Sequence, residues 1–136
     1  MSIQGSCLCG AVRYAVTGPL RPVIACHCRQ CRKTSGHFVA ATSAAHGDIA
    51  IEGEVRWYDS SPDARRGFCP VCGSSLFWDE TGGGRMSIHA GTLDGETGLE
   101  LAGHIFTGAK GDYYRIADGT PQAEADDPAL TTKGAP

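Results

Sequence analysis

FCPVCG, at residues 68–73, is the stretch that decides the fold. Its two cysteines, Cys69 and Cys72, are separated by two residues, and Gly73 follows directly. This pattern is typical of a zinc knuckle, a tight turn that points both sulfurs at one ion, and the glycine allows the close backbone approach that the turn needs. One knuckle supplies two ligands, whereas a structural zinc takes four in a tetrahedron. A second pair of ligands must therefore come from elsewhere in the chain.

The other five cysteines fall into two groups, Cys7 with Cys9, and Cys26 with Cys28 and Cys31. Alternate residues of an extended chain point to the same side, so the pair at positions 7 and 9 can hold one ion. This pair completes a four-cysteine site with the knuckle and leaves three cysteines together. The opposite pairing would leave two ligands alone at positions 7 and 9, so ligand counting favours four plus three. We therefore expect two zinc ions per chain.

Other uses of the cysteines fit less well. Seven thiols in three clusters do not resemble scattered buried cysteines. The odd count and the lack of a secretion signal disfavour disulfides. A thioredoxin-like redox pair at Cys69 and Cys72 would need a parallel βαβ context, which the sequence pattern does not offer. Metal binding is the interpretation that is left.

The three-cysteine group differs chemically from the four-cysteine group. Catalytic zinc usually has three protein ligands and one place for water or substrate. Three thiolates bring negative charge to the metal, so the site suits the capture of a thiol as a thiolate better than the generation of hydroxide. The alternative is a fourth ligand from the fold that closes the site, and the candidates are His27, His37 and His104. Nearby cations that could offset the charge are Arg29, Arg32 and Lys33.

The rest of the sequence predicts one small, mainly β domain with very little helix. The chain has 136 residues and 19 glycines, and short β-type runs alternate with Gly and Pro punctuation. A turn or two of helix is expected at Arg29–Ser35, ended by Gly36. The predicted domain covers residues 1–121, and the Ala-, Asp- and Pro-rich residues 122–136 are expected to form a mobile tail. The expected strands are Ala11–Val16, Phe38–Thr42, Ile49–Ile51, Val55–Tyr58, Ser75–Trp78, Met86–His89 and Leu99–Ile105.

Composition and charge exclude several partners. The formal net charge of −3 argues against nucleic acid or an anionic membrane as a partner bound through a basic field. The apolar stretches are too short to cross a bilayer, and the N-terminal residues lack the features of a signal peptide. A cytoplasmic location is the expectation, and the sequence does not predict an oligomeric state.

Four segments together resemble the family of glutathione-dependent formaldehyde-activating enzymes, zinc-binding carbon–sulfur lyases that include centromere-protein-V-like domains. They are GSCLCG at 5–10, CHCRQCRK at 26–33, RGFCPVCGS at 66–74 and HIFTGAKGDYY at 104–114. The similarity covers about residues 5–121 and includes all seven cysteines. It is therefore much more specific than a single Cys-x-x-Cys motif.

The resemblance implies a β-tent fold of short stacked antiparallel sheets braced by zinc. By position, Cys7, Cys9, Cys69 and Cys72 match the structural zinc ligands of the family, and Cys26, Cys28 and Cys31 match the catalytic ones. The implied reaction is the formation or cleavage of a carbon–sulfur bond, as in the joining of formaldehyde to glutathione to give S-hydroxymethylglutathione. The implied partner is a small thiol such as glutathione.

A pocket for glutathione would need cations and backbone donors for two carboxylates and an amine. The candidate cations are Arg29, Arg32, Lys33, Arg66 and Lys110, and the candidate aromatic walls are Phe38, Phe106, Tyr113 and Tyr114. His27 lies between two predicted ligands and should point away from them in an extended chain. Two alternatives to an enzyme stay open: a non-catalytic zinc-binding interaction module, and a thiol- or redox-sensing zinc protein.

Overall fold

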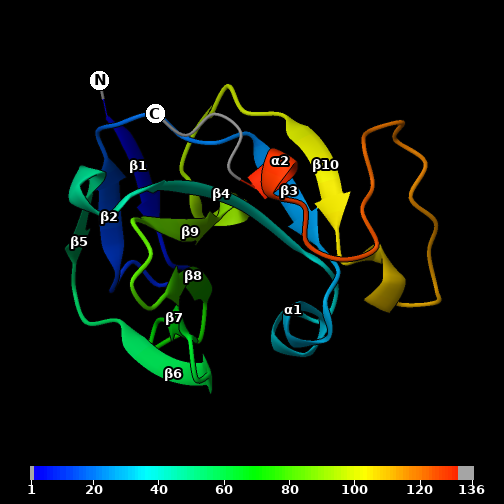
Figure 1. The fold of residues 1–136 in the computed structure, drawn as a ribbon. Helices are drawn as coiled ribbons and strands as arrows, with labels where there is room; N and C mark the ends of the chain where they lie inside the picture. The colour runs from blue at the N-terminus through cyan, green and yellow to red at the C-terminus, as the bar shows by residue number, and fades with distance from the viewer. Residues whose placement is uncertain (1, 132–136) are drawn as a thin grey trace.

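The structure, a computed structural model, describes residues 2–131 as two β-sheets with little helix (Figure 1). The smaller sheet is antiparallel, in the order β1-β2-β5, with β1 at Ile3–Ser6, β2 at Arg13–Val16 and β5 at Ile49–Glu52. The larger sheet has the order β10-β3-β4-β9-β8-β7-β6. Its strands are β3 (Val23–Cys26), β4 (Val39–Ala45), β6 (Arg56–Ser61), β7 (Ala64–Phe68), β8 (Ser75–Glu80), β9 (Arg85–His89) and β10 (Leu101–Ile105).

The mainly β class that the sequence predicts is confirmed, with one difference in the pairing of the strands. All the neighbouring strands of the larger sheet are antiparallel except β10 and β3, which run parallel and pair Ile105 with Cys26. A parallel pair needs a long crossover connection, because the chain must return to the same end of the sheet. Here almost the whole domain lies between β3 and β10, so no local sequence pattern predicts that these two strands pair.

The helix expected at Arg29–Ser35 is confirmed as α1. The Cys28 side chain accepts a hydrogen bond from the backbone N–H of Cys31 and caps the first turn. Gly36 ends the helix at a φ of 85°, a left-handed conformation that glycine adopts without steric cost. The other helical segments are α2 (Pro128–Thr131) and three short 3-10 turns, η1 (His46–Asp48), η2 (Ala90–Thr92) and η3 (Thr107–Ala109).

The seven expected strands are present with shifted ends, and three further strands, β1, β3 and β7, are missing from the sequence-based prediction. The apolar run VIAC of β3 does not alternate, because Val23, Ile24 and Ala25 are all buried. In β7, two consecutive arginines break the alternation of apolar and polar residues. Alternation identifies strands with one solvated face, so these strands escape it.

The inner face of the larger sheet packs on the smaller sheet to form the core. Alternate residues of β4 and β9, among them Ala44 and Ile88, meet Tyr14 and Val16 of β2. The Tyr14 ring meets Phe77 edge to face, with 5.1 Å between the centroids. Gly5 lies so close to Tyr14 that an added Cβ would stand 2.0 Å from its ring, so only glycine fits there.

The outer face of the larger sheet is not covered by a second sheet. It presents the intervening residues of the same strands, including Ala41 and Ser43 on β4 and Ser87 and His89 on β9. Helix α1 lies beside this face across the gap from β6 and β7 (Figure 1). The two faces of the larger sheet therefore differ in their surroundings, because one packs on the smaller sheet and the other borders a cavity.

The C-terminal segment, which the composition assigns to a mobile tail, lies against β10 as far as the structure describes it. The backbone of Ala123 exchanges hydrogen bonds with His104 and Thr107, and Leu130 is buried against Ile24 and Ile105. These contacts continue past residue 121, and Leu130 is the apolar residue that anchors the segment. Mobility of residues 122–131 stays a prediction to be tested, and residues 132–136 lie outside the described part of the chain.

Candidate metal centres and cavity

The four-cysteine cluster joins the loop after β1 to the loop after β7. The sulfur atoms of Cys7, Cys9, Cys69 and Cys72 all lie within 4.8 Å of one another. The Sγ of Cys9 is 3.7 Å from that of Cys7 and 3.8 Å from that of Cys69. Four soft sulfur donors converging on one point fit a tetrahedral metal ion such as zinc. This grouping is the one that ligand counting predicts.

Hydrogen-bond donors lie against two of the sulfur atoms of this cluster. The N–H groups of Val71 and Cys72 point at Cys69 Sγ at 3.4 and 3.5 Å, which is the geometry of a knuckle turn. The Ser74 hydroxyl lies 3.1 Å from Cys72 Sγ and is the main cause that lowers the pKa of this thiol to about 5. Cys69 is fully buried in the core. Cys9 is exposed, so the site reaches from the packed core to the surface.

The three-cysteine cluster lies at the junction of β3 and α1. Cys26 is the last residue of β3, Cys28 caps α1 and Cys31 lies in its first turn, and their Sγ atoms lie within 4.8 Å of one another. Hydrogen bonds from the Cys26 and Cys31 thiols lower the pKa of Cys28 to about 2, and the nearby Arg66 adds to this effect. The shared proton raises the pKa of Cys26 in turn. Three sulfur atoms close together, one of them readily ionised, form a donor set that fits a soft metal ion.

A cavity of about 550 Å³ opens beside this second cluster. Its wall includes Cys26, Cys28 and Cys31 together with the outer face of the larger sheet. The volume falls in the range of about 300–1,000 Å³ that is usual for small-molecule sites. The four-cysteine cluster does not line this cavity. The two clusters therefore differ in their access to this cavity.

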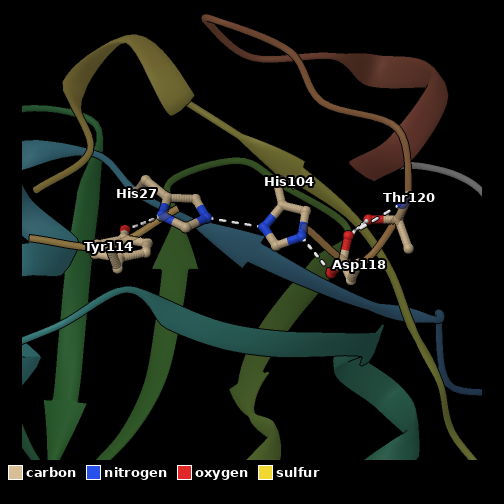
Figure 2. A network of polar contacts seen from close by, with 5 residues as sticks. All are labelled: His27, His104, Tyr114, Asp118 and Thr120. Carbon is tan, nitrogen blue, oxygen red and sulfur yellow. Dashed lines mark hydrogen bonds and ion pairs between the residues drawn. The ribbon is translucent and has the colours of Figure 1, made fainter. Parts of the chain in front are cut away.

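The three histidines considered as a fourth ligand are placed elsewhere. His27 lies between two cysteines of the cluster, but its ring is turned the other way and meets His104 and Tyr114 (Figure 2). His104 is in turn bound to Asp118, with 2.7 Å between Nε2 and Oδ2. His37 bonds to the Tyr113 hydroxyl at 2.6 Å. Among the described residues no histidine shares the three-cysteine cluster, so the alternative of a closed site is not supported.

The cations expected near the cluster need one correction. Arg29, Arg32 and Lys33 do not line the cavity in the described part of the chain, although they follow the cysteines directly in sequence. Lys110 donates to the carbonyl groups of Gly111 and Tyr114. Arg66 on β7 is the cation that reaches the cluster, with its Nη2 3.8 Å from Cys31 Sγ. Sequence proximity misleads here, because the cation at the cluster comes from β7 and not from α1.

The aromatic candidates divide into two groups. Phe106 lines the cavity, as expected for a wall residue. Phe38 and Tyr114 pack against His27, with ring centroids 4.9 and 5.6 Å from it, and Tyr113 packs against His37. Phe106 also has a positive φ of 55°, the only such non-glycine residue described. The chain bends there, directly after β10 and beside the cluster.

The cavity residues that sequence reasoning missed include several from the sheet, one from α1 and one from the loop before β3: Ser43, Trp78, Arg85, Ser87, His89, Gln30 and Arg21. One signal for them exists in the sequence of β9. Arg85, Ser87 and His89 alternate with Met86 and Ile88, so this strand has one apolar and one polar face. The alternation predicts a polar face but does not say that the face borders a cavity, since this depends on strands far away in the sequence.

The fold and the two clusters define a mainly β protein with two thiol sites able to bind metal. The family described as "Glutathione-dependent formaldehyde-activating enzyme" matches residues 2–109. This match covers well over half of the chain, so the protein belongs to that family.

Two curated relatives are similar over different lengths. A Schizosaccharomyces pombe protein named as an uncharacterized lyase is 28% identical over 126 residues, which cover 91% of this chain and 92% of the relative. A Halomonas elongata protein provisionally named as a glutathione-dependent formaldehyde-activating enzyme is 33% identical over 87 residues, 57% of this chain and 55% of the relative. The first relative shows that the similarity extends over nearly the whole described domain.

A solved structure supports the fold. The crystal structure of a Rhodobacter sphaeroides protein superposes with a TM-score of 0.58 and 20% identity, and covers 88% of this chain and 98% of that one. At this identity the likeness concerns the fold alone. No helix in the described residues is long and apolar enough to span a membrane.

Proposed function

We propose that this protein is a zinc-dependent carbon–sulfur lyase that acts on a small thiol adduct, with S-hydroxymethylglutathione formation from formaldehyde and glutathione as the leading case. The observation that supports it most is the position of the three-cysteine cluster in the wall of a ligand-sized cavity. Membership of the family and a relative named as a lyase point to the same reaction class.

In this proposal the two clusters have separate roles. Cys7, Cys9, Cys69 and Cys72 hold a structural zinc, and Cys26, Cys28 and Cys31 hold a catalytic zinc. The three thiolates would hold the zinc, which when bound would supply a Lewis acid able to keep a substrate sulfur in its thiolate form. The three cysteines act as ligands, so their catalytic part is to hold the reaction centre at the cavity wall.

The reaction joins two small molecules and needs no oxidant. The thiol sulfur adds to the carbonyl carbon of formaldehyde, a carbon–sulfur bond forms, and the carbonyl π bond breaks. The proton lost from the thiol ends on the new hydroxyl oxygen. The chain contributes Arg66, whose guanidinium lies 3.8 Å from Cys31 Sγ and offsets the negative charge of the cluster. It also contributes the apolar wall of Ile24, Ile105 and Phe106, which limits water around the sulfur.

The non-catalytic interaction module and the redox sensor have no specific observation in their favour. Both would bind zinc through the same cysteines, and neither requires a cavity beside the three-cysteine cluster. We therefore treat them as outcomes of the test.

A panel of thiols with formaldehyde tests the proposal. Exchange NMR follows the methylene signal of each S-hydroxymethyl adduct with and without the protein. Wild-type protein should accelerate exchange for at least one thiol, and the matched variant Cys28→Ser should not. If no thiol in the panel exchanges faster with the wild-type protein, the enzyme proposal is wrong and the interaction module becomes the better interpretation.

A further inference from the structure

Two buried nitrogen atoms at the cavity lack a partner. Among the residues that the structure describes, three buried side-chain nitrogens have no hydrogen bond, Arg32 Nε, Arg66 Nε and His89 Nε2. Arg66 and His89 line the cavity, and Arg32 does not. Buried polar groups are almost always paired, because an unmade hydrogen bond inside a protein is costly. Two unpaired nitrogens on residues of one cavity wall therefore indicate a place where a ligand supplies the missing hydrogen-bond partner.

The strand register puts the two side chains on the same face of the sheet. Arg66 on β7 pairs with Trp78 on β8, and Trp78 pairs with Ser87 on β9. His89 lies two residues after Ser87, so its side chain leaves the sheet on the same side. All four residues line the cavity. The two nitrogens thus belong to one continuous polar surface.

The Nη2 atom of Arg66, unlike its Nε, has partners. Its Nη2 donates to Gln30 Oε1 at 3.2 Å and lies 3.8 Å from Cys31 Sγ. The residue is only 9% exposed, and no carboxylate in the described chain forms an ion pair with it. The guanidinium therefore borders the three-cysteine cluster on one edge and presents an unpaired N–H on another edge.

The other two arginines of the cavity already have acceptors. Arg21 donates to the carbonyl oxygens of Ala41 and Thr131, and Arg85 donates to the hydroxyl and carbonyl of Ser43. The two acidic residues of the wall, Glu80 and Asp126, form no ion pair with Arg66. The position for an anion is thus Arg66 rather than the cavity as a whole.

Burial, and then the charge of Arg66, lower the pKa of His89 to about 4. At neutral pH its imidazole is uncharged and can present an N–H beside the guanidinium. One cationic fork and one neutral donor match the two oxygens of a carboxylate, whereas a phosphate group would call for more charge.

We propose that Arg66 and His89 form a carboxylate subsite, so that the thiol on which this protein acts carries a carboxylate. The preference for such a thiol rests on the proposed function. Carboxylate binding itself does not, and it can be measured without any reaction.

Calorimetry with S-methylglutathione tests the subsite. This probe keeps both carboxylates, but its sulfur cannot become a thiolate, and its diethyl ester is the neutral comparison. Wild-type protein should bind the acid about 10- to 100-fold more tightly than the ester, the range expected for charge-assisted hydrogen bonds. In Arg66→Gln the preference should fall to about twofold or less. The matched control is Arg65→Gln, since Arg65 is the next residue of β7 and is exposed, with its guanidinium 3.9 Å from the Trp57 ring centre.

Metal content and melting temperature are measured for each variant before binding. If Arg66→Gln loses either, Arg66→Lys replaces it, because lysine keeps the charge but lacks Nε, and most of the preference should still disappear. His89→Gln should lower the preference by a smaller factor than Arg66→Gln.

The outcomes separate the two proposals. Equal binding of acid and ester by the wild-type protein, binding of neither, or an unchanged preference in the Arg66 variant overturns the subsite, whatever the thiol panel shows. An Arg66-dependent preference without any accelerated thiol exchange supports the subsite and contradicts the lyase. Exchange that is equally fast for thiols with and without a carboxylate keeps the lyase and overturns the preference for a thiol that carries a carboxylate.

Discussion

The two cysteine clusters have the same donor chemistry and lie in opposite surroundings. The cluster of Cys7, Cys9, Cys69 and Cys72 lies on the packed side of the larger sheet, with Cys7 and Cys69 in the core between the sheets. The cluster of Cys26, Cys28 and Cys31 borders the cavity on the other side. In the proposed function, the same side chain would stabilise the fold in one place and meet a ligand in the other. What distinguishes the clusters is the number of ligands and the packing around them.

The largest effect should come from removing a ligand on the packed side. Cys69→Ser should give a chain that binds at most one metal ion and does not fold cooperatively. A structural zinc contributes about 10 kcal/mol or more in small domains, which is comparable to the whole stability of a domain. Circular dichroism melting and metal analysis of the purified protein measure this. A cooperative transition close to that of the wild-type protein would contradict the structural role.

Removing a ligand on the cavity side should leave the fold and abolish the chemistry. Cys28→Ser should lose one metal ion, keep a cooperative melting transition, and lower thiol exchange by at least about 100-fold, the upper value for loss of a group that only supports a ligand. The same melting and metal measurements, with the exchange NMR, check this. If Cys28→Ser and Cys69→Ser damage the structure equally, the distinction between the clusters is wrong.

Acidification should lower the free energy of unfolding, and His89 on the cavity side should account for part of the loss. Its ordinary pKa of 6.5 falls to about 4 in the folded protein, so between these pH values the unfolded chain binds a proton that the folded chain does not. Stability should therefore fall as the pH drops from about 6.5 to about 4. At about 1.4 kcal/mol for each pH unit, the loss is at most about 3 kcal/mol.

Urea denaturation at pH 7 and pH 5 measures this loss, and His89→Gln is the comparison. The variant should lose less stability on acidification than the wild-type protein, while protonation of the cysteines affects both chains alike. Identical losses would show that the proton taken up on unfolding belongs to other groups.

The smallest effect concerns the C-terminal segment that borders the cavity side. Leu130 packs against Ile24 and Ile105, and its methyl groups would lie 3.2 Å from a Cβ at Gly103. Leu130→Ala should lower the free energy of unfolding by about 2 kcal/mol, the low end for a buried leucine, because this cluster is small. Urea denaturation measures the stability, and hydrogen exchange of residues 122–131 tests whether the segment is held. An unchanged stability with fast exchange would support the mobile tail that the composition predicts.

Local signals made some features predictable. The end of α1 was predictable from Gly36, whereas the cap that the Cys28 side chain provides at its start is known only from the structure. The grouping of the cysteines follows from the number of ligands that one metal ion needs, which is independent of the fold. Such features need only neighbouring residues or simple stoichiometry.

Features that depend on distant strands were out of reach. Arg66 belongs to the cavity because β7, β8 and β9 pair in one register, and a shift by one residue would turn its side chain to the core. The strand β3 was hidden because both of its faces are buried, and its parallel partner β10 is almost 80 residues away. The cavity could be recognised only after these pairings were known.

The hydrogen-bonded chain from Asp118 to Tyr114 has a direction, and the surface end sets it (Figure 2). The bond from His104 lowers the pKa of Asp118 to about 2, so this carboxylate can only accept. With His104 neutral, its hydrogen lies on Nε2 and its bare Nδ1 accepts from His27 Nε2–H. The remaining nitrogen of His27 then accepts from the Tyr114 hydroxyl. In that state one exposed carboxylate selects one tautomer for each of two buried rings, and every hydrogen bond of the chain is donated in the direction of Asp118.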